Sequence, residues 1–248
     1  MKRKRPIGSA WAEFREKWNI LNHEEKCSLA AQYGVSYDMA KHWYSDFKEE
    51  PAPTDAMSVE ELLASRPATC LDFVSFDIET SNLRADFSVT LTACIKPFGK
   101  EPVSFRADYY PTWQKNRDDD SLIIKDIAEE LARHAIVVTH YGTGFDVPFL
   151  RAKMVKYRLP PLPPMFAVDS YSIAKVNFAV GSRRLENLAN FFDLGKKSPV
   201  EGSLWMKAAY GGDTKAMDAI MEHNIQDVCL LEKLACLSFP YIKAIKRL

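Results

Sequence analysis

Two carboxylates stand one residue apart in the apolar segment Val74–Thr80, and this pair limits what the chain can fold into. The segment predicts a β-strand, and because side chains on a strand alternate between its two faces, Asp77 and Glu79 project from the same side. Carboxylates this close repel each other, and burial would raise both pKa values, so a buried pair needs a cation. Mg²⁺ and Mn²⁺ prefer such oxygen ligands. The alternative is a solvated strand end without a metal.

Two further acidic residues occupy positions from which they can reach the same end of a sheet. Asp146 lies where a glycine-containing turn, residues 141–144, leads into a helix. Asp227 lies within a helix predicted over residues 213–237, and His223 precedes it by four positions, so both face the same way. A surface histidine near a helix end is the alternative for His223. The candidate cluster consists of Asp77, Glu79, Asp146, His223 and Asp227.

From residue 69 onward the pattern of apolar residues predicts an α/β fold. The first three strands follow one another closely and predict an antiparallel meander, whereas two later apolar segments are typical of buried parallel strands. The predicted strands cover the Asp77 segment and residues 88–96, 103–107, 135–140 and 165–168. The predicted helices cover residues 121–134, 184–192, 202–210 and 213–237. A mixed sheet flanked by helices is therefore expected.

The N-terminal part, residues 1–48, predicts a separate helical region. One helix is expected to end at Gly34, where a left-handed turn residue is favoured, and Ser36 can cap a second helix. This arrangement resembles the helix-turn-helix of DNA-binding proteins, although a plain helical or protein-contact module is the alternative. Its expected shared core is Leu29, Ala30, Val35, Met39, Ala40 and Trp43. Residues 49–68 predict a linker, and residues 69–248 the main domain.

The composition restricts the mode of binding and the location of the protein. The formal net charge is zero, so nucleic-acid binding would depend on local patches or metal ions. Arg183 and Arg184 precede a predicted helix, where they could contact phosphate or be solvated. The five cysteines form no CxxC pair, which favours reduced thiols in a cytoplasmic, intracellular protein. No apolar segment predicts a membrane span.

Three segments resemble, in order, the motifs of the DEDD exonucleases of the ribonuclease H-like superfamily. Residues 76–80 are similar to the first motif, residues 140–150 to the second and residues 223–228 to the third. The proofreading domain of family B DNA polymerases and its stand-alone relatives are particularly similar, over roughly residues 71–237. Those relatives have a tyrosine at the position of His223 and often an asparagine at the position of Tyr141.

The resemblance implies a ribonuclease H-like fold and phosphodiester hydrolysis with two Mg²⁺ or Mn²⁺ ions. It implies that the four carboxylates hold the ions and that His223 positions the attacking water or accepts its proton. Substrate contacts are also expected from Thr80, His140, Tyr141 and Phe145, with a place in the core as the alternative for Phe145. Asp169 is expected to cap the following helix rather than to lie near the second metal.

The leading functional prediction is therefore a metal-dependent 3′–5′ exonuclease acting on DNA, with replication or repair proteins as possible partners. A structure-specific or RNA-directed endonuclease would use the same chemistry. A DNA-binding protein with an inactive nuclease-like domain is the alternative from another class.

Overall fold

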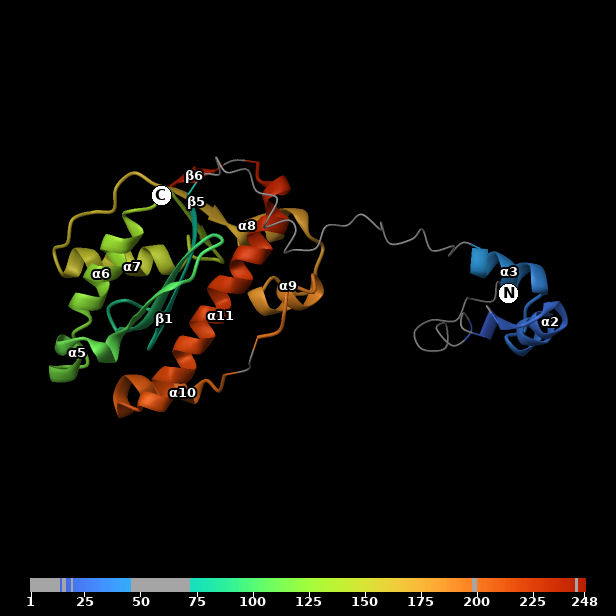
Figure 1. Cartoon of the computed structure of the whole chain (residues 1–248), viewed down its shortest axis with the longest axis horizontal. Coiled ribbons are helices and arrows are strands. Elements are labelled where there is room, and N and C mark those ends of the chain that lie inside the picture. Colours follow the sequence, from blue (N-terminus) through green and yellow to red (C-terminus); the bar gives the residue numbers. More distant parts are fainter. Residues whose placement is uncertain (1–13, 15–16, 19, 46–71, 198–199, 244) are drawn as a thin grey trace. The chain divides into compact units, whose positions relative to one another are not determined.

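A computed structural model describes residues 14, 17–18, 20–45, 72–197, 200–243 and 245–248 of the protein (Figure 1). The chain divides into two units, Met1–Ala56 and Met57–Leu248, which are described separately below. The predicted linker, residues 49–68, and the side chain of Trp43 lie outside the described residues.

In the N-terminal unit, helices α2 (His23–Gln32) and α3 (Tyr37–Ser45) are joined by a short turn. Gly34 adopts the left-handed conformation in this turn, with φ at +65°. The hydroxyl of Ser36 accepts a hydrogen bond from the backbone N–H of Met39 at 3.3 Å and so caps α3. The predicted helix end and helix cap are both confirmed.

The core of the N-terminal unit differs in part from the predicted one. Met39 is 45% exposed, so its predicted place in the core is wrong. Aromatic side chains that precede α2 fill this core, and the rings of Phe14 and Trp18 stack with their centroids 5.3 Å apart. The buried core residues are Phe14, Trp18, Leu29, Ala30 and Ala40.

The larger unit is built on a six-stranded sheet with the strand order β3-β2-β1-β4-β5-β6. The pairs β1–β2 and β2–β3 are antiparallel, and the pairs β1–β4 and β4–β5 are parallel. The expected mixed sheet, a meander combined with parallel strands, is confirmed. The strands are β1 (Phe73–Thr80), β2 (Thr90–Pro97), β3 (Val103–Arg106), β4 (Ile136–Thr139), β5 (Phe166–Asp169) and β6 (Lys246–Arg247).

Helices cover both faces of this sheet. Figure 1 shows α11 on one side of β1 and helices α6 and α7 on the other. The longer helices are α6 (Ser121–Leu131), α7 (Asp146–Lys156), α8 (Ser170–Asn177) and α11 (Thr214–Ser238), and the shorter ones are α5 (Pro111–Lys115), α9 (Leu185–Phe191) and α10 (Ser203–Met206). Among the described residues, none of the helices has the length and hydrophobicity that crossing a membrane requires.

The alternation of side chains along β1 decides where the site forms. Val74, Phe76 and Ile78 are buried in the main hydrophobic core, which also contains the isoleucines of α6. Asp77 and Glu79 therefore project from the opposite face of the strand, where α11 crosses β1 and β2. The largest core of the unit thus fixes the direction in which both carboxylates point.

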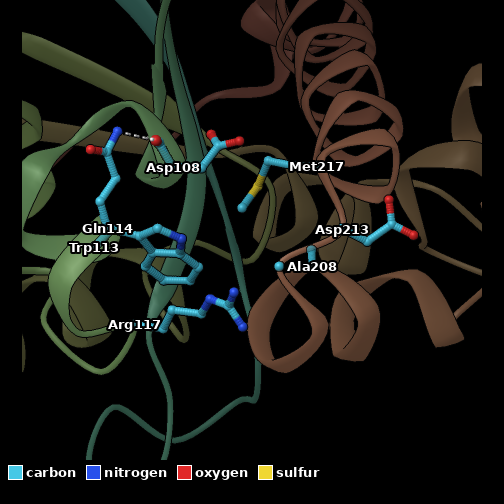
Figure 2. A pocket seen from close by; sticks show the side chains of 8 residues that line it. Asp108, Trp113, Gln114, Arg117, Ala208, Asp213 and Met217 are labelled. Carbon is cyan, nitrogen blue, oxygen red and sulfur yellow. Dashed lines mark hydrogen bonds between the residues drawn. The ribbon is translucent and has the colours of Figure 1, made fainter.

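The segment before α11 differs from the single helix predicted over residues 202–210. Helix α10 is followed by a π-helical turn, Lys207–Gly211, which ends at Gly212 with φ at +64°. Nη1 of Arg117 donates a hydrogen bond to the carbonyl of Tyr210 at 2.7 Å. Figure 2 shows Arg117 pointing toward this turn at the edge of a pocket of about 260 Å³, with Trp113 and Met217 among the other residues that line it. The turn is thus anchored to the segment that follows α5.

Candidate functional site

The structure brings together predicted site residues from three different elements. Asp77 and Glu79 come from β1, Asp146 is the first residue of α7, and His223 and Asp227 belong to α11. Ligand atoms of Glu79, His223 and Asp227 all lie within 4.8 Å of one another. Nε2 of His223 is 3.9 Å from Oε1 of Glu79 and 4.0 Å from Oδ2 of Asp227. This spacing is suitable for side chains that share one cation.

Asp77 is oriented by an asparagine of α11. Nδ2 of Asn224 donates a hydrogen bond to Oδ2 of Asp77 at 2.6 Å. Oδ1 of the same amide accepts a hydrogen bond from the hydroxyl of Thr92 on β2 at 3.1 Å. Because Asn224 is fully buried and bonded at both ends of its amide, it fixes the rotamer of the Asp77 carboxylate.

Glu79 is oriented by the indole of Trp205 on α10. The indole N–H donates to Oε2 of Glu79 at 2.8 Å. The Trp205 ring also meets the His223 ring edge to face, with centroids 5.6 Å apart. One tryptophan therefore contacts both a candidate ligand and the candidate proton acceptor.

Asp146 is held by the backbone of the neighbouring strand and turn. The backbone N–H of Ile78 on β1 donates to Oδ1 of Asp146 at 3.0 Å. Gly142 lies so close that a Cβ atom there would be 2.9 Å from Oδ2 of Asp146 and 2.4 Å from Cβ of Thr139. Only glycine fits this position, which explains the glycine-containing turn before Asp146.

The two carboxylate oxygens of Asp227 differ in their surroundings. Nζ of Lys197 lies 2.5 Å from Oδ2 of Asp227. Oδ1 of Asp227 is buried and has no hydrogen-bond partner among the described residues. A buried carboxylate oxygen is costly to leave unbonded, so this atom is suited to bind a cation.

Burial and mutual repulsion make this cluster reluctant to ionise fully. Burial raises the pKa of Asp77 well above its usual value, and the charges of Asp146, Asp227 and Glu79 raise it further. Burial also raises the pKa of Glu79 to about 7, against the opposing effect of the Trp205 hydrogen bond. Burial raises the pKa of Asp146 to about 7, although the Ile78 N–H favours its charged form. Divalent cations would remove the repulsion, and this all-oxygen carboxylate set with one imidazole fits a divalent cation.

The residues predicted to contact substrate lie around this cluster in different settings. Thr80 is buried, and its hydroxyl donates to the carbonyl of Asn82 at 2.7 Å. Tyr141 is 55% exposed, has φ at +65°, and lies edge to face on Tyr171. Phe145 is half-buried with its ring 5.7 Å from that of Phe149.

His140 is engaged by protein groups at both ring nitrogens. Nδ1 lies 2.8 Å from the hydroxyl of Ser170, and Nε2 lies 2.8 Å from the carbonyl oxygen of Arg183. Burial lowers the pKa of His140, which favours the neutral ring. This geometry gives His140 a role in holding the surrounding loops.

Asp169 has the capping role that was predicted and an additional one. Its Oδ1 accepts from the backbone N–H of Ser172 at 3.1 Å and caps α8. The same carboxylate accepts from the backbone N–H of Tyr141 at 3.1 Å and from the hydroxyl of Thr143 at 2.6 Å. Asp169 therefore ties α8 to the turn that precedes Asp146.

Three residues of the site were not predicted as such from the sequence. Asn224 and Trp205 contact carboxylates only because α10 and α11 pack on the sheet, and neither has a distinctive spacing. Lys197 belongs to a basic pair in the sequence, but its contact with Asp227 depends on the loop path between α9 and α10. The only feature of the sequence that could have indicated one of these three residues is the position of Asn224 directly after His223.

Comparisons with known proteins agree with this fold. The solved structure of the family B DNA polymerase from the hyperthermophilic archaeon Pyrobaculum calidifontis is similar to the chain, with a TM-score of 0.55 and 21% sequence identity. The similarity covers 69% of this chain and 25% of the polymerase, so the chain spans about a quarter of that protein's length. At this identity the similarity demonstrates a shared fold. None of the curated proteins compared with the chain matches it.

A family model gives the more specific result. The model described as the RNase_H superfamily matches residues 74–237, which include both carboxylates of β1, the first residue of α7 and the carboxylate of α11. This match extends over more than half of the chain. The chain therefore belongs to the RNase_H superfamily.

Proposed function

We propose that this protein is a metal-dependent 3′–5′ exonuclease that hydrolyses phosphodiester bonds of DNA with two divalent ions. The observation that carries the proposal is the convergence of carboxylates from β1, α7 and α11 on one face of the sheet, where the pKa of Asp77 responds to the charges of Asp146, Asp227 and Glu79. A chain that buries like charges together without a cation would lose stability. Membership of the RNase_H superfamily supports a nuclease reaction.

The four carboxylates are the proposed ligands, and Mg²⁺ or Mn²⁺ the proposed ions. When bound, the ions would lower the pKa of the attacking water and stabilise the leaving 3′ oxygen. Asp77 is the carboxylate that would contribute to holding both ions, since the charges of all three other carboxylates act on it. The hydrogen bonds from Asn224, Trp205 and the Ile78 N–H hold the ligands in position before ions or substrate bind.

His223 is the proposed acceptor of the proton from the attacking water. Its Nε2 lies between Glu79 and Asp227, at 3.9 and 4.0 Å from their nearest oxygens. An imidazole nitrogen can act as a general base, and the two neighbouring carboxylates would offset the positive charge that the ring gains. Nζ of Lys197, 2.5 Å from Oδ2 of Asp227, would supply a positive charge beside this carboxylate.

A second candidate function, a nucleic-acid-binding protein without nuclease activity, is favoured by the same lysine. The ammonium group of Lys197 already supplies one positive charge to Asp227. One cation offsets only part of the repulsion among four carboxylates, and Oδ1 of Asp227 stays without a hydrogen bond among the described residues. We therefore rank the nuclease first.

The test is a degradation assay with DNA and RNA strands labelled at either end. Each strand is incubated with Mg²⁺, Mn²⁺ or EDTA, single-stranded or in a duplex. A ladder that shortens stepwise from the 3′ end of DNA and disappears in EDTA is the expected result. Internal cuts would indicate an endonuclease, and preferential loss of RNA would indicate that RNA is the substrate. Strands that stay intact with every metal would favour the nucleic-acid-binding protein without nuclease activity.

A pair of variants shows whether the observed cleavage comes from this site. Asp77→Asn removes the central carboxylate and should abolish cleavage. Glu222→Gln removes an exposed carboxylate of the same helix as His223 and should leave the rate unchanged. Equal rates in the two variants would assign the activity to a contaminant.

A further inference from the structure

Arg183 is a cation that no described residue pairs with. It lies in the loop before α9, and the residue as a whole is half-buried. Its Nε atom is buried and has no hydrogen-bond acceptor in the described part of the chain, and no carboxylate of that part forms an ion pair with its guanidinium group. A buried N–H without an acceptor is costly, so its persistence suggests that the missing acceptor belongs to a ligand.

The backbone of Arg183 is fixed by His140. Because a carbonyl oxygen can only accept, Nε2 of His140 must carry the hydrogen and donate it to the carbonyl of Arg183 at 2.8 Å. Nδ1 of the ring lies 2.8 Å from the hydroxyl oxygen of Ser170, and that hydroxyl donates its hydrogen to the carbonyl of Thr139 at 3.0 Å. Asn187 contributes from the other side, since its Nδ2 donates to the carbonyl of Ser182 at 2.7 Å. The loop is therefore held in place, although the guanidinium group has no hydrogen-bond partner among the described residues.

This anchoring ties the backbone of Arg183 to the segment that leads into Asp146. His140 directly precedes the turn whose Gly142 lies against the Asp146 carboxylate. His140 is also close enough to Asp227 for the charge of that carboxylate to raise the pKa of His140, against the larger effect of burial. The Arg183 carbonyl is thus hydrogen-bonded to His140, which lies between β4 and the turn before Asp146.

We infer that Arg183 binds a backbone phosphate of the nucleic-acid strand next to the bond that is cut. A guanidinium group presents Nε–H and Nη–H side by side, which matches two oxygens of one phosphate. Carboxylates dominate the metal site, so a strand that enters it needs positive groups at its border. His140 acts through Arg183 as a positioning residue.

The inference rests on the proposed function for one point, that the ligand is a nucleic acid. The experiment therefore measures binding of a strand and not its cleavage. Fluorescence anisotropy follows a 5′-labelled single-stranded DNA with Ca²⁺ in place of Mg²⁺, and gels verify that the strand stays intact. A series of strands carries one uncharged methylphosphonate at successive positions from the 3′ end. The proteins are the wild type, Arg183→Ala, Arg183→Gln and the control Arg184→Ala, which changes an exposed neighbour.

We expect Arg183→Ala and Arg183→Gln to bind the all-phosphate strand about tenfold more weakly than the wild type. One methylphosphonate position should weaken binding by the wild type and by Arg184→Ala to the same extent, and should have no further effect on the Arg183 variants. Circular dichroism of both Arg183 variants verifies folding, and Arg183→Gln keeps a side chain of similar length if alanine unfolds the loop.

Three results would overturn the inference: unchanged affinity of the Arg183 variants, an equal sensitivity of all four proteins to each methylphosphonate, or no binding by the wild type. A strand that binds through Arg183 but is never cut with Mg²⁺ or Mn²⁺ would refute the nuclease and support the phosphate site. The two proposals can therefore fail separately.

Discussion

Asn224 donates a hydrogen bond to Asp77 across 2.6 Å, which joins α11 to strand β1 at a carboxylate whose pKa is raised by burial and by its acidic neighbours. The amide can do this in one orientation only, because its other end accepts from Thr92. Three elements thus determine the direction of a single carboxylate. A residue adjacent to His223 in the sequence belongs to the site through this contact and not through a metal bond.

Asn224→Ala should therefore weaken Mn²⁺ binding about 10- to 100-fold, as loss of a partner that orients a metal ligand commonly does. Cleavage at fixed metal concentration should fall in parallel. Isothermal titration of the folded variant measures the affinity. Gln226→Ala is the control, since Gln226 lies on the same helix and donates to the exposed Glu222. Unchanged Mn²⁺ affinity in Asn224→Ala would count against the orienting role.

Without metal, the protein should lose stability as the pH rises from about 5 to about 8. The pKa of Glu79 is raised from 4.5 to about 7 and that of Asp146 from 3.8 to about 7, so the folded protein binds protons that the unfolded chain has already released. Folding then becomes less favourable with increasing pH, until both groups are ionised in the folded state. Mn²⁺ should reverse the effect, most strongly at pH 8.

Melting temperatures at pH 5.5 and 8, with EDTA or Mn²⁺, measure this dependence. The double variant Asp77→Asn with Glu79→Gln serves as the reference, because it lacks two of the repelling charges. Its melting temperature in EDTA should decline less between the two pH values than that of the wild type. An equal decline in both proteins would show that the pH dependence arises elsewhere.

Trp205→Phe should move the acidic limb of the activity profile to higher pH. The indole N–H lowers the pKa of Glu79, so its removal leaves that carboxylate protonated over a wider range. The rate near neutral pH should fall about tenfold, as expected for a lost hydrogen bond to a charged group. Trp113→Phe is the control. It makes the same substitution at a buried tryptophan shown in Figure 2 that does not bond to Glu79, and so measures the effect of a smaller ring alone. A parallel loss of rate at every pH would argue against the pKa effect.

Gly212→Ala should destabilise the protein by about 1–2 kcal/mol, because alanine is disfavoured at a φ of +64°. A Cβ atom there would also lie 2.2 Å from Nη2 of Arg117, so this side chain would have to move away from the Tyr210 carbonyl. Gly211→Ala is a matched control, since a Cβ atom at Gly211 meets nothing within 4 Å. Urea unfolding of the two variants compares them, and equal midpoints would contradict the expected strain.

The sequence was sufficient to predict five of the six strands and the face on which the carboxylates of β1 lie, because both follow from local periodicity. The apolar alternation around Asp77 directs that side chain away from the core in any sheet buried on its other face. Strand β6 was not predicted, since its two residues are Lys246 and Arg247 and only backbone pairing with β5 defines it. The π-helical turn at residues 207–211 was likewise missed, because its side-chain pattern is that of an ordinary helix.

The site residues that could be predicted are those that are charged and that share a helical or strand spacing with another site residue. The helical period pairs Asp227 with His223, and the strand period pairs Glu79 with Asp77. The structure brings Glu79, His223 and Asp227 together. The partners of the carboxylates could not be predicted, because a hydrogen bond such as that from Trp205 to Glu79 joins residues 126 positions apart and depends on packing. Met39 was wrongly placed in a core for the same reason, since the aromatic residues that displace it precede α2.

The central claim is that the four carboxylates form a site for two divalent ions, and counting bound Mn²⁺ tests it most directly. Isothermal titration at pH 8 should give two Mn²⁺ ions per chain for the wild type and for Glu222→Gln. Asp77→Asn, which lacks the carboxylate proposed to serve both ions, should bind at most one ion with reduced affinity. The account would be contradicted by a wild type that binds no Mn²⁺, or by an Asp77→Asn variant that binds two ions as tightly as the wild type.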